Sequence, residues 1–231
     1  SLERLVGHDG IEAILHRDAS ISTTIKLRAI ARHQQLLRID FETQPSFEIL
    51  NSVLADFTKE IEKADVVILS DYGKGGLEHI EKMIQIARDA KKPVLVDPKG
   101  DDYARYRGAT LITPNRNEFR QVAGSWKSEA DLTEKAQRLR QTLGLDALLV
   151  TRSEDGMSLY LEAGVLHEGV RVKEVFDVSG AGDTVIATFG TMLASGASFE
   201  NSMRVANRAA GIVVGKLGTA VVTRDELENR E

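Results

Sequence analysis

Residues 65–97 read DVVILSDYGKGGLEHIEKMIQIARDAKKPVLVD, with a short apolar run on either side of a segment that has helical spacing. The runs at 65–70 and 93–97 are continuous in Val, Ile and Leu, which is typical of parallel strands buried on both faces. The segment between them carries an apolar stripe at i, i+3, i+4 and i+7: Ile80, Met83, Ile84 and Ala87. A strand, a helix and a strand in this order predict a right-handed crossover in a parallel sheet.

The same alternation of strands and helices continues along the rest of the chain. The further expected strands are 110–113 and 146–151, and the further expected helices are 47–61, 132–143, 181 to about 195 and 199 to about 215. We therefore predict an α/β domain with a mainly parallel sheet, formed by residues 1–231 as one unit.

Two stretches depart from this alternation. Residues 24–42 have strand-like patterns on each side of a short polar turn, which predicts a β-hairpin standing off the main sheet. Residues 156–175 contain short strands joined by Glu-Ala-Gly and Glu-Gly, which predicts an antiparallel meander late in the sheet. The expected architecture is one α/β domain with a small β appendage.

The composition excludes several classes of protein. With 231 residues, 42% hydrophobic and 28% charged, the chain is that of an ordinary globular protein. A net charge of −5 disfavours a nucleic-acid partner, and the absence of cysteine excludes disulfides and thiolate metal sites. Its apolar runs are too short to cross a membrane and its first residues have no signal-peptide pattern, so we expect a cytoplasmic protein without a membrane partner.

The stretch 174–189, EVFDVSGAGDTVIATF, carries the clearest chemical signal. A strand ends, a Gly-Ala-Gly turn follows, and a helix of small and apolar residues begins at once. The backbone N–H groups at such a helix start have no partners within the helix and lie at the positive end of its dipole. Gly180, Ala181 and Gly182 are therefore a candidate main-chain anion site, suited to a phosphate or to charge that develops during phosphoryl transfer.

Asp183 directly follows this anion site. A carboxylate there would repel a phosphate, unless it acts as the base that takes a proton from an attacking hydroxyl. The alternative is an acidic residue that the helix dipole favours in the first turn. Spacing alone leaves the two interpretations about equal.

A second motif, Asn115-Arg116-Asn117-Glu118, follows the expected strand at 110–113. Asn115 with Glu118 three residues later is a variant of the helix capping box. The same residues could organise nucleotide phosphates. Both interpretations can hold together, because a cap fixes the loop that would surround a metal ion.

The run Asp177-Val-Ser-Gly-Ala-Gly-Asp183 resembles the C-terminal signature of the ribokinase (PfkB) family of carbohydrate kinases. The chain lacks a Walker A loop, as that family does. The resemblance implies a three-layer fold, ATP and Mg²⁺ as cofactors, Asp183 as catalytic base and residues 180–182 as the anion hole. It further implies that Glu118 acts on Mg²⁺ through water and that Asp177 lies near K⁺ in members that bind a monovalent cation.

Longer runs resemble one subgroup of that family, the heptose 7-phosphate kinases, from about residue 20 to the end. These runs are LSDYGKG, VLVDPKGDDYARYRGATLITPN, LVTRSEDGMSL and ANRAAGIVVGKLGT. The likeness implies transfer of the ATP γ-phosphate to O1 of D-glycero-β-D-manno-heptose 7-phosphate for ADP-heptose and lipopolysaccharide core synthesis. It also implies nucleotide contacts by Arg116, Asn117, Arg152, Gly156 and Asn207, although a single Asn on a helix is more often a surface residue.

The hairpin, residues 22–42 in this comparison, corresponds to a lid. Lys26, Arg28 and Arg38 on it could reach the sugar phosphate, whose two charges need cationic partners, or could form a solvated face. Asp71 and Asp97 follow strands at the edge where open α/β sheets place ligands, and each could instead make a turn. Asp71 is a candidate sugar ligand.

The resemblance begins late, which predicts a kinase domain without its N-terminal part. It also implies a homodimer formed through the lids, and a native protein fused to an adenylyltransferase, for which no His-x-Gly-His motif occurs in this chain. Two alternatives remain: a related kinase for another sugar or sugar phosphate, and an inactive nucleotide-binding fragment. A Rossmann dinucleotide site is the weakest alternative, because no Gly-x-Gly-x-x-Gly follows the first strand.

Overall fold

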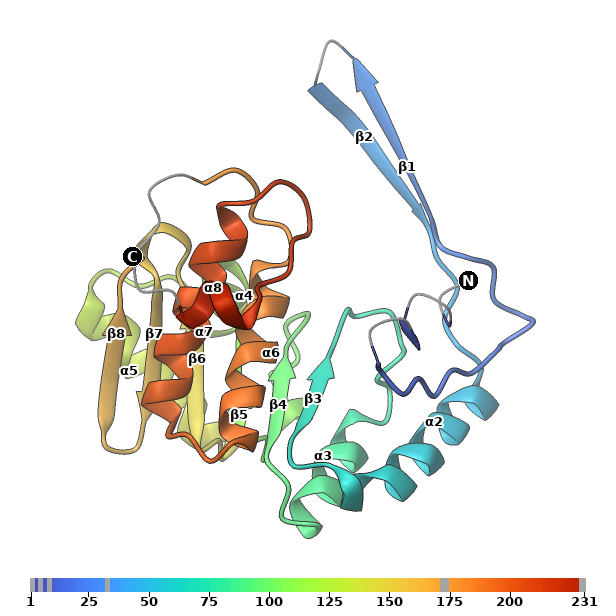
Figure 1. Cartoon of the computed structure of the whole chain (residues 1–231), viewed down its shortest axis with the longest axis horizontal. Coiled ribbons are helices and arrows are strands. Elements are labelled where there is room, and N and C mark those ends of the chain that lie inside the picture. The colour runs from blue at the N-terminus through green and yellow to red at the C-terminus, as the bar shows by residue number, and fades with distance from the viewer. Residues whose placement is uncertain (1–2, 4–5, 8–9, 32–33, 171–174, 229–231) are drawn as a thin grey trace.

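A six-stranded sheet forms the centre of the computed structural model, which describes residues 3, 6–7, 10–31, 34–170 and 175–228 (Figure 1). In spatial order the strands are β3 (Val67–Ser70), β4 (Val94–Asp97), β5 (Leu111–Ile112), β6 (Ala147–Thr151), β7 (Met157–Leu161) and β8 (Gly164–Glu168). The first four are parallel, and β7 and β8 pair antiparallel. The mainly parallel sheet is confirmed, with the strand expected at 110–113 shortened to two residues.

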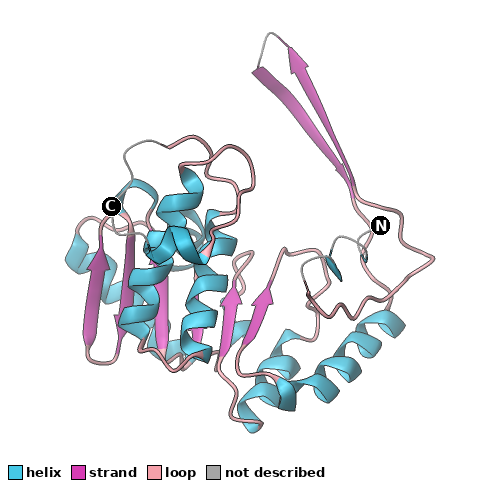
Figure 2. Cartoon of the chain, in the orientation of Figure 1, coloured by secondary structure: helices cyan, strands magenta, loops and turns pink. Residues whose placement is uncertain are grey.

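Helices cover both faces of this sheet and give three layers (Figure 2). One face packs against α2 (Phe47–Glu60), α3 (Ile80–Asp89), α4 (Arg116–Ala123) and α5 (Glu129–Leu143). The other face packs against α6 (Ala181–Ala194) and α7 (Phe199–Val214), and α8 (Arg224–Glu228) follows. Because side chains alternate along a strand, Leu148 and Val150 of β6 enter the first core, and Ala147 and Leu149 enter the second.

The helix boundaries follow local signals in the sequence. The Ser128 side chain accepts a hydrogen bond from the Asp131 amide and caps the start of α5. Gly144 ends the same helix in the left-handed conformation, with φ of 63°, which confirms the expected end. Ser46 and Ser198 cap α2 and α7 in the same way as Ser128 caps α5.

The predicted hairpin is confirmed as β1 (Ile25–Ala31) and β2 (Gln34–Phe41), which project from the body of the domain (Figure 1). Its register places Lys26 opposite Asp40 and Arg28 opposite Arg38, on one face. Pairs such as Leu27 with Ile39 lie on the other face. The hairpin therefore has a charged face and an apolar face, and every residue of β1 is exposed.

The late meander is present as β7 and β8. Within the described residues no strand follows Glu168, and the expected continuation at 171–174 lies outside them. Residues 1–2, 4–5 and 8–9 also lie outside the described residues. No helix in the described part of the chain is long and apolar enough to span a membrane.

Candidate active site

A cavity of about 610 Å³ opens at the carboxyl edge of the sheet. It is bounded by the start of α4, the turn after β6, the start of α6 and the C-terminal half of α7. Its wall is largely apolar, with Val178, Val185 and Val214 among the lining residues. The predicted nucleotide residues that line it are Asn115, Arg116, Asn117, Gly156, Ala181, Gly182 and Asn207. Residues far apart in sequence thus meet where open α/β sheets bind ligands.

The start of α6 presents free backbone donors to this cavity. Gly180 is the N-terminal cap with φ of 78°, a conformation that favours glycine, and it has no side chain to satisfy the first-turn amides. Among the first-turn amides of α6, the Ala181 amide donates to the Val178 carbonyl at 3.2 Å. No described residue accepts from the Gly182 amide, and the space beside its Cα is open. The geometry fits an anion held by main-chain N–H groups.

Asp183 lies in the first turn of α6 and is exposed. The Tyr72 hydroxyl donates to its Oδ1 at 3.4 Å. Across the same edge, burial raises the pKa of Asp97 to about 6, and the charges of Glu118 and Asp183 add to that effect. Asp97, Glu118 and Asp183 therefore lie close enough at this edge for their charges to act on one another.

The second of these cavities, of about 500 Å³, shares Asn115 and Asn117 with the first. Glu118 lines it and completes the capping box: its Oε2 accepts from the Asn115 amide at 3.0 Å. Its Oε1 accepts from the Lys99 ammonium at 2.8 Å. The capping interpretation is correct, and the cap holds Glu118 with one oxygen directed at Lys99 beside the cavity.

The residues at this edge fit Mg²⁺ only through water. In the described part of the chain, no three His, Cys, Asp or Glu side chains converge as metal ligands. Mg²⁺ keeps several waters and commonly binds one or two carboxylates together with substrate phosphates. Glu118 beside Asp97 supplies such carboxylates. Burial raises the pKa of Asp97, the charges of Glu118 and Asp183 add to that effect, and a bound cation would oppose it.

Asp177 fixes the loop before α6. The Ser179 amide donates to its Oδ1 at 2.9 Å, and hydrogen bonds from Ser179, with a smaller one from Gly218, lower the pKa of Asp177. The neighbouring Phe176 amide donates to the Val214 carbonyl at the end of α7. The carboxylate therefore stays charged and joins the loops that flank the start of α6.

The model of the pfkB family of carbohydrate kinases matches residues 1–225. The chain belongs to this family. It is 53% identical over 226 residues to a D-beta-D-heptose 7-phosphate kinase of Bordetella bronchiseptica, covering 98% of this chain and 72% of that protein. It is 49% identical to the bifunctional protein HldE of Nitrosococcus oceani, covering 99% of this chain and 48% of that protein.

Solved structures of the family confirm the ribokinase-like fold. Ribokinase from Thermotoga maritima superposes with a TM-score of 0.77 at 20% identity, covering 98% of this chain and 75% of that one. Phosphofructokinase-2 from Escherichia coli, in complex with potassium, gives a TM-score of 0.78 at 16% identity, with the same coverage. The chain spans about half the length of the bifunctional relatives that it matches.

The structure places Arg152 and Asp71 of this pfkB-family chain outside the large cavity, and Asn207 at its rim. Arg152 is buried beside α5, outside the large cavity, and pairs with Glu129. Asp71 is buried too: its carboxylate accepts from the Tyr106 hydroxyl at 2.9 Å and from the Gly73 amide at 2.8 Å. The Asn207 side-chain amide donates to the Gly169 carbonyl at 2.9 Å, at the rim of the cavity.

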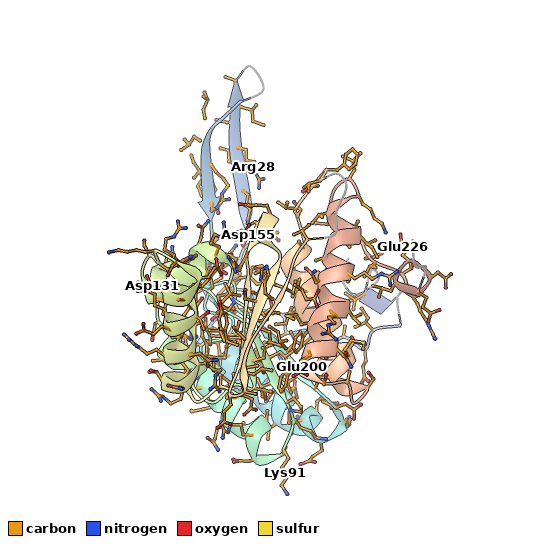
Figure 3. All side chains as sticks on the ribbon, turned by 90° about the vertical axis from the view of Figure 1, so that its left-hand side faces the viewer. Arg28, Lys91, Asp131, Asp155, Glu200 and Glu226 are labelled. Carbon is orange, nitrogen blue, oxygen red and sulfur yellow. The ribbon has the colours of Figure 1, made fainter. Side chains whose placement is uncertain are left out.

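Lys26, Arg28 and Arg38 lie on the projecting hairpin, where Arg28 is labelled in Figure 3. Sequence reasoning missed Tyr72 and Lys99 at the second cavity. The available signal was their position: each follows the carboxyl end of a predicted parallel strand by two residues, where ligand contacts concentrate.

Proposed function

We propose that the chain is an ATP-dependent kinase that phosphorylates O1 of D-glycero-β-D-manno-heptose 7-phosphate to the 1,7-bisphosphate, for ADP-heptose and lipopolysaccharide core synthesis. The observation that carries the phosphotransfer is the start of α6, where exposed Asp183 adjoins the free Gly182 amide at the large cavity. The choice of sugar rests on the 53% identity to a protein named as a heptose 7-phosphate kinase.

In this mechanism Asp183 accepts the proton of the O1 hydroxyl as that oxygen attacks the γ-phosphorus. The new O1–P bond forms as the bond between the γ-phosphorus and the β–γ bridging oxygen breaks, and ADP leaves. The amides of residues 180–182 hold the negative charge on the transferred group. Asp183 suits the role because it is exposed and lies beside those amides.

The large cavity would hold the nucleotide, with Asn115, Arg116, Asn117, Gly156 and Asn207 around it. Its apolar valine wall suits the face of a nucleobase. Glu118 would orient the waters of a bound Mg²⁺, whose charge neutralises the phosphates. Asp177 would contribute to a monovalent-cation site beside the anion hole, and K⁺ is the candidate ion.

The hairpin would close over the sugar phosphate as a lid. Directly opposed like charges destabilise a strand pair, and Arg28 lies opposite Arg38. A bound phosphate dianion would relieve that repulsion, with Lys26 on the same face as a third cation. The opposite, apolar face supports a homodimer formed through the lids, which sedimentation of the chain and of a Leu27→Asp variant would test.

The native protein would lie in the cytoplasm, where ATP is supplied. It would carry a fused adenylyltransferase if it follows the bifunctional relatives, and would lack one if it follows the Bordetella kinase. A related sugar or sugar-phosphate kinase remains the second candidate, because the solved relatives of this fold include a ribokinase and a phosphofructokinase.

Release of ADP tests the proposal. The chain is incubated with ATP and Mg²⁺ and with heptose 7-phosphate, ribose, fructose or fructose 6-phosphate. We expect turnover with heptose 7-phosphate to exceed that with the other sugars by at least about 100-fold in kcat/KM. Ribose and fructose lack the phosphate that the site would bind, and fructose 6-phosphate holds its phosphate at a different distance from its reacting hydroxyl. Faster turnover with another sugar would favour the second candidate.

A further inference from the structure

The turn between β6 and β7, residues 152–156, forms one wall of the large cavity through Ser153, Glu154 and Gly156. This turn is tightly closed by its own backbone. The Arg152 amide donates to the Gly156 carbonyl at 2.7 Å, and the Gly156 amide donates to the Ser153 carbonyl at 3.0 Å. A change in the position of this turn would therefore move the cavity wall as a unit.

The Arg152 side chain leaves the turn on the side away from the cavity and enters the protein. Only 8% of the side chain is exposed. Its guanidinium forms a fork with Glu129, the first residue of α5, with N–O distances of 2.8 and 2.6 Å. It also donates to the Ser158 hydroxyl of β7 at 3.1 Å, so it joins the turn to a helix and to the next strand.

A second arginine secures the same turn from the opposite side. Arg116, in the first turn of α4, donates to Glu154 at 3.3 Å and pairs with Asp155. Asp155 is labelled in Figure 3, at the upper end of the body of the domain. The turn is thus held between α4 and α5 by two arginines, of which only Arg116 also lines the large cavity.

We propose that Arg152 is a positioning residue for the nucleotide: its ion pair with Glu129 fixes the turn 152–156 and so sets nucleotide affinity without touching the nucleotide. A bidentate guanidinium–carboxylate pair is directional, and this one is shielded on the arginine side. The ion pair also raises the pKa of Arg152, so the guanidinium stays charged throughout the working range. This inference rests on the proposed function, because it takes the large cavity as the nucleotide site.

The test measures the dissociation constant of a non-hydrolysable ATP analogue by calorimetry, together with KM for ATP, kcat and the melting temperature. We expect Arg152→Met to weaken nucleotide binding about tenfold, with a smaller change in kcat. A displaced cavity wall reduces the affinity for the nucleotide more than it disturbs the reacting groups, which lie on other elements. Arg152→Lys should recover part of the affinity, because it keeps the charge and loses the fork.

Glu129→Gln separates positioning from contact. Its carboxylate is 71% exposed, so the variant should fold, yet we expect it to weaken nucleotide binding by about threefold, with an unchanged melting temperature. The matched control is Glu134→Gln on the same helix, whose carboxylate is 69% exposed and pairs with Arg138 at 2.6 Å. The control should leave nucleotide binding unchanged.

The double variant completes a thermodynamic cycle. If Arg152 acts through Glu129, the variant with both substitutions binds nucleotide about as weakly as Arg152→Met alone. The positioning role would be overturned if the two substitutions had additive effects on the free energy of nucleotide binding. It would also be overturned if Glu129→Gln bound nucleotide normally. Failure of the unchanged chain to bind the ATP analogue would instead overturn the proposed function.

Discussion

The carboxyl edge of the sheet and the hairpin β1–β2 hold their charged residues in opposite ways. At the sheet edge Glu118 is fixed by the Asn115 amide and by Lys99, and Asp71 is fixed by Tyr106. On the hairpin, Arg28 lies exposed opposite Arg38, and Arg38, itself half exposed, pairs with Asp40 at 3.0 Å. This difference shows that the sheet edge fixes its charged groups before any ligand binds, whereas the hairpin keeps two opposed arginines whose repulsion a bound anion would relieve.

The largest expected effect tests the chemistry of the organised edge. Replacing Asp183 with Asn removes the proposed base and should lower kcat by about 10²- to 10⁴-fold, with nucleotide affinity changed less than about threefold. Single-turnover kinetics and calorimetry measure the two quantities. Asp225→Asn, at an exposed position of α8, is the control, and equal turnover by the Asp183 and Asp225 variants would remove Asp183 from the mechanism.

The next prediction concerns the rigidity of the same edge. Gly156 has φ of 79°, and a Cβ there would meet the Glu168 carbonyl oxygen at 2.0 Å. Gly156→Ala should therefore lower the free energy of unfolding by about 3 kcal/mol and weaken nucleotide binding, as measured by urea denaturation and calorimetry.

Gly169→Ala is the control for that substitution, because nothing lies within 4 Å of a Cβ at this position and its φ is not positive. It should leave unfolding nearly unchanged. A Gly156 variant as stable as this control would show that the turn adjusts to the added methyl group. It would contradict the claim that the sheet edge is rigid before a ligand binds.

The hairpin should respond in the reverse manner. Arg28→Gln or Arg38→Gln should raise KM for the sugar phosphate about tenfold, because a charge-assisted contact is lost, and should leave KM for ATP unchanged. Arg28→Gln should also leave stability equal or slightly higher, because it removes the like-charge pair. Arg38→Gln additionally loses the ion pair with Asp40, which as an exposed pair contributes little.

Steady-state kinetics with each substrate varied in turn checks this prediction. Arg17→Gln, 84% exposed outside the hairpin, is the control. An equal rise in both KM values would contradict the division of the molecule into a nucleotide edge and a sugar lid.

The smallest expected effect is electrostatic. The pKa of Asp97 is raised to about 6 in the folded state by burial and neighbouring carboxylates, above the 3.8 of an ordinary Asp. Between these values the folded state binds more protons than the unfolded state, so this group makes the protein less stable as pH rises from about 4 to 6. Asp97→Asn should therefore raise the melting temperature at pH 8, and the difference should vanish near pH 4.

Thermal denaturation of both proteins across that range measures the effect. Asp101→Asn, at an exposed position in the loop after β4, provides the control. A pH-independent difference between wild type and the Asp97 variant would mean that charge repulsion at the edge is not its cause.

Much of the organised edge could be predicted from the sequence, because its signals are local. The apolar runs and helical stripes predicted the sheet, and the capping box and the Gly-Ala-Gly turn predicted how α4 and α6 begin. Parallel topology then brings these starts to one edge. The family signature supplied the candidate roles of Asp183 and Glu118.

The missed features depend on side-chain direction and on long-range contacts. Nothing in the run Thr151-Arg152-Ser153 says that the guanidinium turns inward to Glu129, 23 residues earlier. Tyr72 reaches Asp183 across 111 residues of sequence. Asp71 is likewise bound by the hydroxyl of Tyr106, a residue 35 positions later in the sequence. Periodicity assigns residues to faces of elements, and it leaves such pairings open.

Phosphorus NMR of the reaction product tests the central claim most directly. The chain is incubated with ATP, Mg²⁺ and heptose 7-phosphate, and the phosphate resonances are followed over time. The account predicts a new anomeric 1-phosphate signal that grows with ADP while the 7-phosphate signal is retained. A phosphate on any other oxygen, or ADP formed with inorganic phosphate alone, would contradict it.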